Sequence, residues 1–496
     1  MGDEEYYLGF DVGTSGIKTA LIDSCGKIIA MSSKNYPSYT RKNGWHEQNP
    51  KDWWGALIET TRIVLSKSKV YPTKVNGISI GTQGLGVIPI TSNGQELTPC
   101  MTWLDKRAEK QAEKIFRERG LKVSAKDPVS KILWLKENRP EIFKSTYKFV
   151  DCSGYLIMKL TGRYAWPEES AITYGYDPEK GKWKFVDYGL FPETLPEIVN
   201  ANAKVAELSQ NASEILGLPK EIPVFAGGSD VTVAYVGSGA IKPGSVHIYL
   251  GSSSWVCLVT KERLKSKKFH LFYSRPFGYW LNIGESESAC LSLEWFRKII
   301  FENSLKNISK QYAIITKMAS KVTVGSDNLL FIPWMQGERA PISDDFARGL
   351  LFGLKLNHTK GHIFRSVMEG VAYNCRWIFE ELLELYKIRK VKVIRAVGGG
   401  FLNELWCKIF ADVFGLEIQV VGNPQFTGAT GAALIAALGQ GSYKQIEDLH
   451  LLIPASYLKR PTNKNKRIYD HLFKVFRELY WERINKIYKK LASFET

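Results

Sequence analysis

The sequence lacks the features that mark several common classes of protein. Its seven cysteines are scattered, with no two closer than 32 residues, which excludes the close spacing of zinc and dithiol redox motifs. No apolar run approaches the ~20 residues that span a bilayer, and no apolar segment follows basic residues at the amino terminus. We therefore expect neither a membrane helix nor a signal peptide, and a cytoplasmic protein with reduced thiols.

Two signatures of nucleotide binding are also missing. The GxxxxGK[ST] phosphate loop does not occur, and the glycine run at 398–400 does not have the GxGxxG spacing of dinucleotide folds. What the sequence has is globular composition, with 496 residues, 44% hydrophobic and 24% charged. At about 100 to 200 residues per domain, this length predicts two to four domains.

Basic residues exceed acidic ones, 67 to 50, for a net charge of +17. About half of the excess lies between Lys459 and Lys490, which hold eleven basic and three acidic residues. Apolar residues recur there every three to five positions, which predicts an amphipathic helix within 457–496. The residues of this stripe are Leu472, Phe476, Leu479, Ile484, Ile487 and Leu491. We expect the helix to dock on its own domain, in preference to binding RNA or a membrane surface.

Strand-type and helix-type segments alternate along the chain, which predicts an α/β fold. Residues 7–23 and 247–260 share one pattern, in which two apolar strands flank a turn of small residues, so the chain divides into comparable halves near residues 240 to 260. Helices are expected at 50–66, 106–118, 130–137, 362–386 and 403–414. Strands are expected at 76–80, 224–226, 391–397 and 417–421.

Both repeated turns are suited to phosphate. Gly13, Thr14 and Ser15 in the first, and 251–253 (Gly251, Ser252, Ser253) in the second, offer unhindered backbone N–H groups and hydroxyls. Asp11 ends the strand before the first turn, where its carboxylate could serve Mg²⁺, and Lys18 on the outgoing strand could add a cation. The alternative for this segment is an ordinary hairpin with an exposed aspartate.

Two further segments run from a strand through glycines into a helix. Asp230 follows Gly227 and Gly228 and lies at or near the first position of a helix, where it is either the N-cap or a general base for a hydroxyl nucleophile. The run Gly398, Gly399 and Gly400 permits a tight turn and close approach to a flat ligand.

Together these residues resemble the FGGY carbohydrate kinases, of the actin/hexokinase/Hsp70 superfamily, over roughly residues 6 to 455. Further matching motifs are Gly-Trp-His-Glu-Gln-Asn-Pro at 44–50, Trp-Leu-Asp-Lys-Arg at 103–107, Ser-Lys-Ile-Leu-Trp at 130–134, Gly-Glu-Arg-Ala-Pro at 337–341, Met-Glu-Gly at 368–370 and Gly-Ala-Thr-Gly-Ala-Ala at 428–433. The resemblance implies two ribonuclease-H-like, actin-like ATPase domains around a cleft that holds ATP, Mg²⁺ and a sugar or polyol.

The resemblance also implies a role for each matching position. Asp230 is then the catalytic base, which also contacts the substrate, and Asp11 the residue that helps to hold Mg²⁺. Phosphates fall to Thr14, Lys18, Ser252 and Ser253 with the glycines and serine of their turns, and adenosine to 398–400 and Asn403. The expected sugar-recognition residues are Gln83, Trp103, Asp105 and Arg107. For Trp103 the alternative is a core aromatic, and for Asp105 a helix N-cap.

The expected division is an N-terminal sugar- and phosphate-binding domain at 1–245, a nucleotide-binding domain at 246–456 and the basic helix at 457–496. Phosphorylation of a ketopentose such as D-xylulose, giving D-xylulose 5-phosphate, is favoured by the resemblance. Xylulose kinases usually have Gln-Met-His-Gly where this chain has Gln83-Gly-Leu-Gly86, so ribulose, gluconate, erythritol and glycerol stay as alternative substrates. A non-catalytic nucleotide or sugar sensor is the alternative of another class. The expected partners are ATP and the sugar, with a second copy of the chain as a further candidate and neither nucleic acid nor membrane.

Overall fold

The computed structural model describes residues 5–40, 42, 44–263, 266, 268–274, 277–302, 307–388 and 390–492. They form two compact units. The first comprises the chain up to Gly237 together with Phe426–Ile453, and the second comprises Ser238–Gln425 and the chain from Pro454. Residues 426–453 were assigned from the sequence to the second domain, but they pack with the first unit. Dividing the chain in sequence order cannot show that a later segment folds back onto an earlier unit.

The first unit is built on a mixed sheet with the strand order β13-β14-β5-β1-β2-β3. Strands β1, β2 and β3 pair antiparallel, as expected for the first repeated segment, whereas β5 and β14 run parallel to β1. The bounds are β1 Tyr6–Val12, β2 Gly16–Asp23, β3 Ile28–Asn35, β5 Val75–Thr82, β13 Lys204–Glu207 and β14 Pro223–Ser229.

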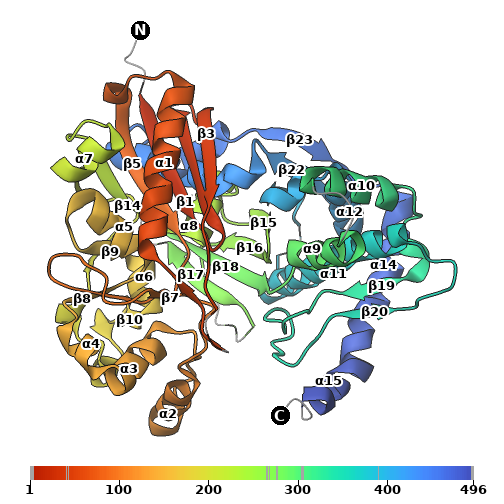
Figure 1. Cartoon of the computed structure of the whole chain (residues 1–496). Helices are drawn as coiled ribbons and strands as arrows, with labels where there is room; N and C mark the ends of the chain where they lie inside the picture. Colours follow the sequence, from red (N-terminus) through yellow and green to blue (C-terminus); the bar gives the residue numbers. More distant parts are fainter. Residues whose placement is uncertain are drawn as a thin grey trace. The chain divides into compact units, whose positions relative to one another are not determined.

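Helices cover both faces of this sheet. On one face, α1 (Pro50–Ser68) and α5 (Cys152–Thr161) share a core with the inward residues of β1, and Figure 1 shows both helices on the same side. The side chain of Asn49 caps α1, and Pro50 occupies its first turn. On the other face, α13 (Thr427–Gln440) lies so close that a Cβ on Gly9 would be 2.0 Å from the carbonyl oxygen of Ala429. The small residues of α13 explain this approach.

The remaining elements of the first unit are short. Its other helices are α2 Glu109–Arg119, α3 Pro128–Asn138, α4 Pro140–Ser145, α6 Glu168–Thr173, α7 Gln210–Leu216 and α8 Asp230–Ser238. Its small strands are β4 Glu47–Gln48, β6 Ile88–Ile90, β7 Cys100–Met101, β8 Lys148–Val150, β9 Ala165–Pro167, β10 Tyr176–Asp177, β11 Lys182–Trp183 and β12 Glu197–Val199. Of the antiparallel pairs β4–β7 and β6–β8, β6 follows Gln83 in the chain and β7 precedes Trp103.

The second unit repeats this plan with the strand order β17-β18-β16-β15-β21-β22-β23. Its β18-β16-β15-β21-β22 core matches β3-β2-β1-β5-β14 of the first unit, including the parallel pairing of the last three strands. The bounds are β15 Val246–Leu250, β16 Ser254–Thr260, β17 His270–Ser274, β18 Tyr279–Ser286, β21 Val393–Val397, β22 Glu417–Val421 and β23 Ala455–Lys459. A separate pair consists of β19 Leu330–Ile332 and β20 Leu350–Phe352. The internal repeat predicted from the sequence is thus a repeat of structure.

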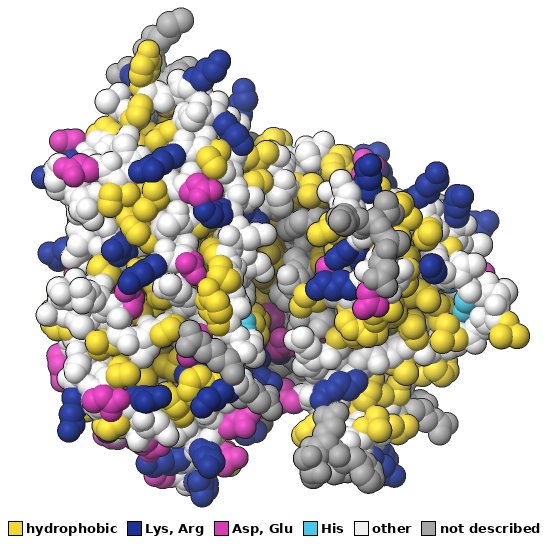
Figure 2. Space-filling model, viewed as in Figure 1, with side chains coloured by type: hydrophobic (Ala, Val, Ile, Leu, Met, Phe, Trp, Pro, Cys, Tyr) yellow, Lys and Arg dark blue, Asp and Glu magenta, His cyan; other side chains and the backbone are white. Residues whose placement is uncertain are grey.

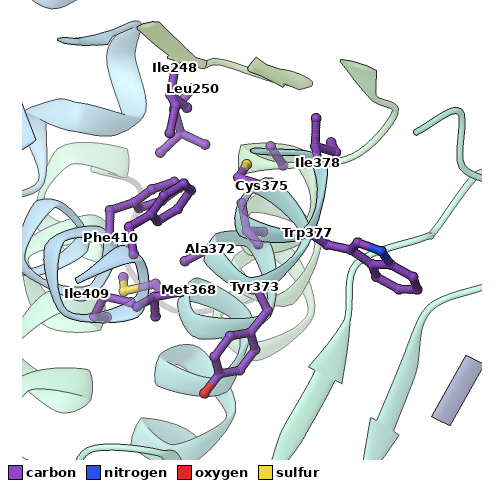
Figure 3. Packing of buried hydrophobic residues seen from close by; sticks show 14 of the residues in the cluster. Ile248, Leu250, Met368, Ala372, Tyr373, Cys375, Trp377, Ile378, Ile409 and Phe410 are labelled. Carbon is purple, nitrogen blue, oxygen red and sulfur yellow. The ribbon is translucent and has the colours of Figure 1, made fainter. Parts of the chain in front are cut away.

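The long helix α11 (Lys360–Leu385) forms the centre of the second unit's core. In Figure 3, Met368 and Ala372 lie on the side of α11 toward Phe410, whereas Trp377 points away from them. Trp377 instead packs against the ring of Trp334. Helix α11 is buried on several sides, and its buried Arg365 and Glu369 form an ion pair with each other. The other helices here are α9 Cys290–Phe301, α10 Ile308–Ser320 and α12 Glu404–Phe414.

The basic carboxyl-terminal segment is not one regular helix. It consists of α14 (Asn463–Glu478), a π-helical segment (Leu479–Ile484) and α15 (Asn485–Ala492), and residues 493–496 lie outside the described residues. Tyr480 and Tyr488 are buried, whereas Ile487 and Leu491 of the predicted stripe are more than half exposed. Ile484 of the predicted stripe is buried, so the stripe is wrong only at Ile487 and Leu491, because the wider π turn rotates the following residues around the axis.

The described residues include no helix long and apolar enough to cross a membrane. On the face shown in Figure 2, Lys and Arg side chains are scattered among acidic and apolar ones, without one dominant basic patch.

Candidate active site

The first predicted phosphate turn joins β1 to β2 and is held by side chains from elsewhere in the first unit. The Gly13 N–H donates to the carbonyl of Gly16 at 3.1 Å, which closes the turn. The indole N–H of Trp103 donates to the hydroxyl of Thr14 at 2.9 Å, and the Gln48 amide donates to the Thr14 carbonyl at 2.6 Å. The turn and the predicted sugar-binding Trp103 are therefore in direct contact.

Asp11 and Lys18 lie opposite each other on β1 and β2. The Asp11 carboxylate is only partly exposed, and burial raises its pKa while the charge of Lys18 lowers it. The first turn of α13 comes close to this carboxylate, since a Cβ on Gly428 would lie 2.5 Å from Asp11 Oδ2. Asp11 thus stands beside the turn and near a helix N-terminus, where negative charge is favoured.

Gln83 directly follows β5, and its backbone N–H donates to the carbonyl of Val12 at the end of β1. Its side chain is 5% exposed, and its amide nitrogen donates to Gln48 Oε1 at 2.7 Å. Gln48 therefore joins Gln83 to Thr14, and Thr14 in turn binds Trp103. Gln48 belongs to the motif at 44–50 but had no predicted role.

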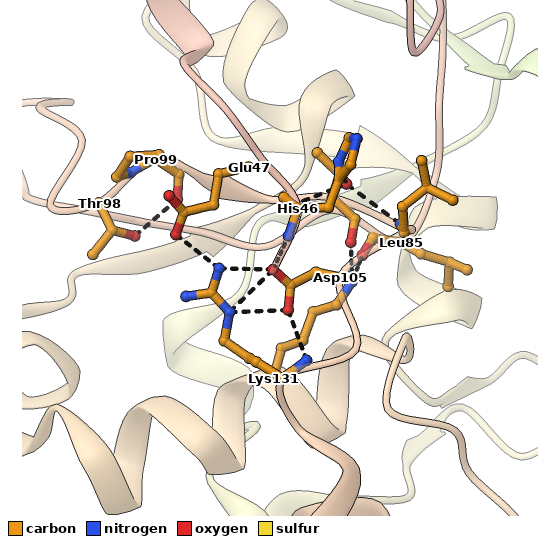
Figure 4. Close-up of polar contacts among 10 residues, drawn as sticks. His46, Glu47, Leu85, Thr98, Pro99, Asp105 and Lys131 are labelled. Carbon is orange, nitrogen blue, oxygen red and sulfur yellow. Dashed lines mark hydrogen bonds and ion pairs between the residues drawn. The ribbon is translucent and has the colours of Figure 1, made fainter. Parts of the chain in front are cut away.

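Arg107 forms buried ion pairs with both Asp105 and Glu47, and Figure 4 shows these two carboxylates with their hydrogen bonds. Arg107 reaches Asp105 through two guanidinium nitrogens, at 2.7 to 3.0 Å, and Glu47 at 2.7 Å. Its guanidinium carbon stacks 3.6 Å from the ring centre of Trp45, and the His46 N–H donates to Asp105 Oδ2 at 2.8 Å. Asp105 and Glu47 therefore both accept from Arg107, whose guanidinium binds Asp105 in a bidentate manner and stacks on Trp45. These contacts favour a positioning role, and direct sugar binding by Asp105 and Arg107 stays a prediction.

Lys131 was not among the predicted site residues. It is completely buried, and its ammonium donates to the carbonyls of Leu85 and Thr102, at 2.7 Å each. Burial lowers its pKa to about 8. Lys131 therefore ties the loop after Gln83 to the segment before Trp103. The motif at 130–134 could have indicated its importance, but no sequence pattern gives its partners.

Asp230 is the first residue of α8, as predicted. The capping of this helix falls to other residues. Ser229 Oγ accepts the N–H of Thr232 at 3.3 Å, and the buried carboxylate of Glu169 accepts the Ser229 N–H at 2.8 Å and the Thr232 hydroxyl. Asp230 Oδ1 accepts the adjacent N–H of Val231 at 2.9 Å. The geometry therefore weighs against the N-cap alternative for Asp230.

Gly227, of the glycine pair before Asp230, is required because β14 and β5 lie too close together there for a side chain. The register between β14 and β5 shifts between Phe225 and Gly228. Gly227 has φ of +73°, and a Cβ there would lie 1.9 Å from the Ile80 carbonyl oxygen. Only glycine fits such a bulge, which directs the end of β14 into α8.

The second predicted phosphate turn joins β15 to β16 and is anchored by the start of α9. The Cys290 N–H donates to the Gly251 carbonyl at 3.0 Å, and the N–H groups of Ala289 and Leu291 donate to the Ser252 carbonyl at 2.9 and 3.2 Å. The turn closes through the Gly251 N–H and the Ser253 carbonyl at 2.9 Å. The carbonyls of this turn are thereby occupied by the helix N–H groups.

The glycine run at 398–400 leaves β21, which pairs parallel with β15. It therefore lies beside the turn at 251–253, at the same edge of the sheet. Asn403 is the N-cap of α12, accepting the N–H groups of Leu405 and Trp406, and its amide nitrogen donates to Thr316 at 2.9 Å. The roles of these residues toward adenosine stay predictions.

The described residues contain no group of three or more His, Cys, Asp or Glu side chains that could hold a metal ion. A surface hollow of about 660 Å³ lies in the first unit, away from the predicted site residues. It is lined by Lys114, Glu118, Arg119, Leu133, Lys136, Glu137, Asp187 and Tyr188.

Comparison with known proteins matches nearly the whole chain. The N-terminal domain of the FGGY family of carbohydrate kinases matches residues 6–237, and the C-terminal domain of that family matches residues 246–439. Gluconokinase of Bacillus subtilis (strain 168) is 28% identical over 509 residues, covering 99% of this chain and 98% of the relative. Xylulose kinase of the same organism is 28% identical over 493 residues, covering 96% and 97%. The crystal structure of gluconate kinase from Lactobacillus acidophilus superposes with a TM-score of 0.85 and 25% identity, covering 99% of this chain and all of the other.

Proposed function

Because the chain belongs to the FGGY family of carbohydrate kinases, which use ATP as phosphate donor, we propose that it phosphorylates a ketopentose such as D-xylulose. In this reaction the sugar hydroxyl oxygen forms a bond to the γ-phosphorus as the bond to ADP breaks. The proton of the hydroxyl passes to a carboxylate of the enzyme. Xylulose kinases among the relatives, such as that of Bacillus subtilis, support this acceptor.

The observation that carries the proposal is the state of Asp230. The Ser229 hydroxyl accepts the N–H of Thr232 and so caps α8, and Asp230 follows it as the first residue of the helix. The first turn of a helix is a position where negative charge is favoured, and a general base has to carry that charge. We assign Asp230 the role of taking the proton from the attacking hydroxyl and orienting its oxygen.

The phosphate groups are assigned to the two turns. Thr14, Ser15 and Lys18 in the first unit, and Ser252 and Ser253 in the second, offer hydroxyls, N–H groups and a cation of the kind that binds phosphate. The glycines at 398–400, beside the second turn, are assigned to the adenosine.

Asp11 is the residue assigned to Mg²⁺. Mg²⁺ is usually held by one or two carboxylates together with waters and phosphate oxygens, so a single partly buried aspartate fits it without a cage of protein ligands. Bound there, Mg²⁺ would neutralise negative charge on the phosphate oxygens.

Gluconate is the second candidate acceptor. Gluconokinase of Bacillus subtilis covers 99% of this chain, and gluconate kinase of Lactobacillus acidophilus has the same fold throughout. Gln83-Gly-Leu-Gly86 also departs from the pattern of xylulose kinases. The absence of the expected histidine weakens the case for D-xylulose but does not favour a carboxylate by itself. The cytoplasmic location and a homodimer stay predictions.

The test measures ADP release with D-xylulose, D-ribulose, D-gluconate, erythritol and glycerol. We expect the highest kcat/KM with a ketopentose, and activity confined to gluconate would replace the substrate assignment.

Asp230→Asn should lower kcat by about 10² or more while ATP binding is kept. Asp187→Asn removes an exposed carboxylate and serves as the matched control with unchanged kcat. Activity of Asp230→Asn above about a tenth of the parent rate would refute the base assignment.

A further inference from the structure

Gln83 presents a buried oxygen that no described residue satisfies. The side chain is 5% exposed, and its Oε1 has no hydrogen-bond partner among the described residues. A buried acceptor left without a donor is unfavourable, and such groups in proteins usually meet a ligand or an ordered water. The question is whether this oxygen, and not the amide nitrogen, is truly the open end.

The orientation of Gln83 is determined by groups whose hydrogen-bonding role is fixed. The Thr14 carbonyl can only accept, so the atom of Gln48 at 2.6 Å from it is the amide nitrogen. The Trp53 indole N–H can only donate, so the atom of Gln48 at 3.3 Å from it is the oxygen. That same oxygen lies 2.7 Å from Gln83, which must therefore turn its nitrogen toward Gln48. Gln83 is left with its oxygen as the open end.

From this geometry we propose that Gln48 is a positioning residue that fixes Gln83 as a pure acceptor for one hydroxyl hydrogen of the sugar. The inference rests on the proposed function and deepens it. A group that can only accept, such as a carboxylate or a carbonyl oxygen, is disfavoured at this point, because two acceptors would face each other. The recognised group is an alcohol of the substrate.

The same residue connects sugar recognition to the phosphate turn. The Gln48 amide nitrogen donates to the Thr14 carbonyl and to Ser38 Oγ at 2.8 Å, while its oxygen serves Gln83. The Thr14 hydroxyl in turn accepts from Trp103. Loss of the Gln48 amide is therefore expected to disturb both the hydroxyl selectivity and the use of ATP, whereas loss of Gln83 Oε1 disturbs only the first.

The experiment uses the sugar with the highest kcat/KM and its analogues, in which one hydroxyl at a time is replaced by hydrogen or by fluorine. Fluorine can accept weakly but cannot donate. At the position that Gln83 contacts, both analogues should lose about tenfold or more in kcat/KM with the parent enzyme. In Gln83→Met the parent sugar should fall by a similar factor, and the two analogues should lose no more.

Gln48→Leu should abolish the same discrimination although Gln83 is present, and should also raise the KM for ATP. Ser38→Ala is the matched control, because it removes one hydrogen bond of Gln48 without touching Gln83 or Thr14, and it should keep the discrimination. Thermal unfolding checks that each variant is folded. Where Gln83→Met does not fold, Gln83→Asn, which withdraws the oxygen by one methylene, takes its place.

The outcomes separate the inference from the function on which it rests. If no sugar is phosphorylated by the parent enzyme, the proposed function fails and the inference falls with it. If a sugar is phosphorylated but the analogue penalties are the same in the parent, Gln83→Met and Gln48→Leu, only the inference is overturned. In that case the open oxygen binds water.

Discussion

Lys131 gives the sharpest prediction on stability, because its buried ammonium makes unfolding depend on pH. Burial lowers the pKa of this lysine to about 8 in the folded protein, whereas the unfolded chain has the ordinary value of 10.5. Below pH 8 both states hold the proton. Between pH 8 and 10.5 the unfolded state binds more protons than the folded state, so the free energy of unfolding rises with pH.

The size of this effect follows from the two pKa values. At about 1.4 kcal/mol per unit, burial of the charge costs about 3 kcal/mol at pH 7, and raising the pH to 9.5 relieves about 2 kcal/mol of it. In Lys131→Met this relief is absent, since no proton is exchanged. Relative to the variant, the parent enzyme should therefore gain about 2 kcal/mol between pH 7 and 9.5.

Urea-induced unfolding of both proteins at the two pH values measures this difference. Subtracting the variant from the parent removes the contributions of other titrating groups. Lys114→Met, which removes an exposed lysine, is the control and should keep the pH dependence of the parent. If the difference in the free energy of unfolding between the parent and Lys131→Met changes by less than about 0.5 kcal/mol from pH 7 to 9.5, Lys131 is not a buried, charged lysine.

Three further variants test the ion pair, the sheet packing and the carboxyl-terminal helix. Arg107→Lys cannot keep the bidentate contact and the stacking on Trp45, so the KM for the sugar should rise by about tenfold or more, whereas the exposed Arg163→Lys should leave it unchanged in the same kinetic assay. Gly9→Ala should destabilise the protein by about 1 to 3 kcal/mol in urea unfolding, because its Cβ would lie 2.0 Å from a carbonyl oxygen, whereas Gly55→Ala, in open space on α1, should stabilise it slightly. Ending the chain at Pro461 should abolish soluble expression, because it uncovers Trp334 and Trp377, whereas deleting only the residues after 490 should not.

The elements that sequence patterns predicted well are those set by local periodicity. The helices predicted at 50–66 and 403–414 are found as α1 and α12, within two residues at each end, and both repeated hairpins are present. Local sequence patterns did not predict that residues 426–453 pack with the first unit. Helix α13 was not among the predicted helices, and the motif at 428–433 was assigned to the second domain, whereas its small residues pack against Gly9 of the first sheet.

The carboxyl-terminal segment shows a second limit of such patterns. A stripe drawn with one helical period passes through Leu472, Phe476 and Leu479 and then continues to Ile487. The π-helical segment breaks that period, so that Tyr480 and Tyr488 are buried beside Ile484 in place of Ile487, and their hydroxyls bind Asp344 and the Arg348 carbonyl. Aromatic residues with a polar end suit this position, because one end is packed and the other is hydrogen-bonded.

Site chemistry was harder to predict than site position, because a residue's role depends on partners distant in sequence. The resemblance implied that Asp105 binds sugar hydroxyls, yet its oxygens accept from Arg107, two residues along the chain, and from the His46 backbone, 59 residues away. Gln83 was predicted for the same reason, and its oxygen is the one that stays open. The resemblance implied both residues as sugar ligands. They differ because Arg107 occupies the oxygens of Asp105, whereas Gln48 orients Gln83 so that its oxygen is left without a partner among the described residues. If the site binds the sugar as proposed, residues that need not contact the substrate set its specificity, and substitutions at 47, 48 and 107 should change which sugars are accepted as much as substitutions at 83 and 103.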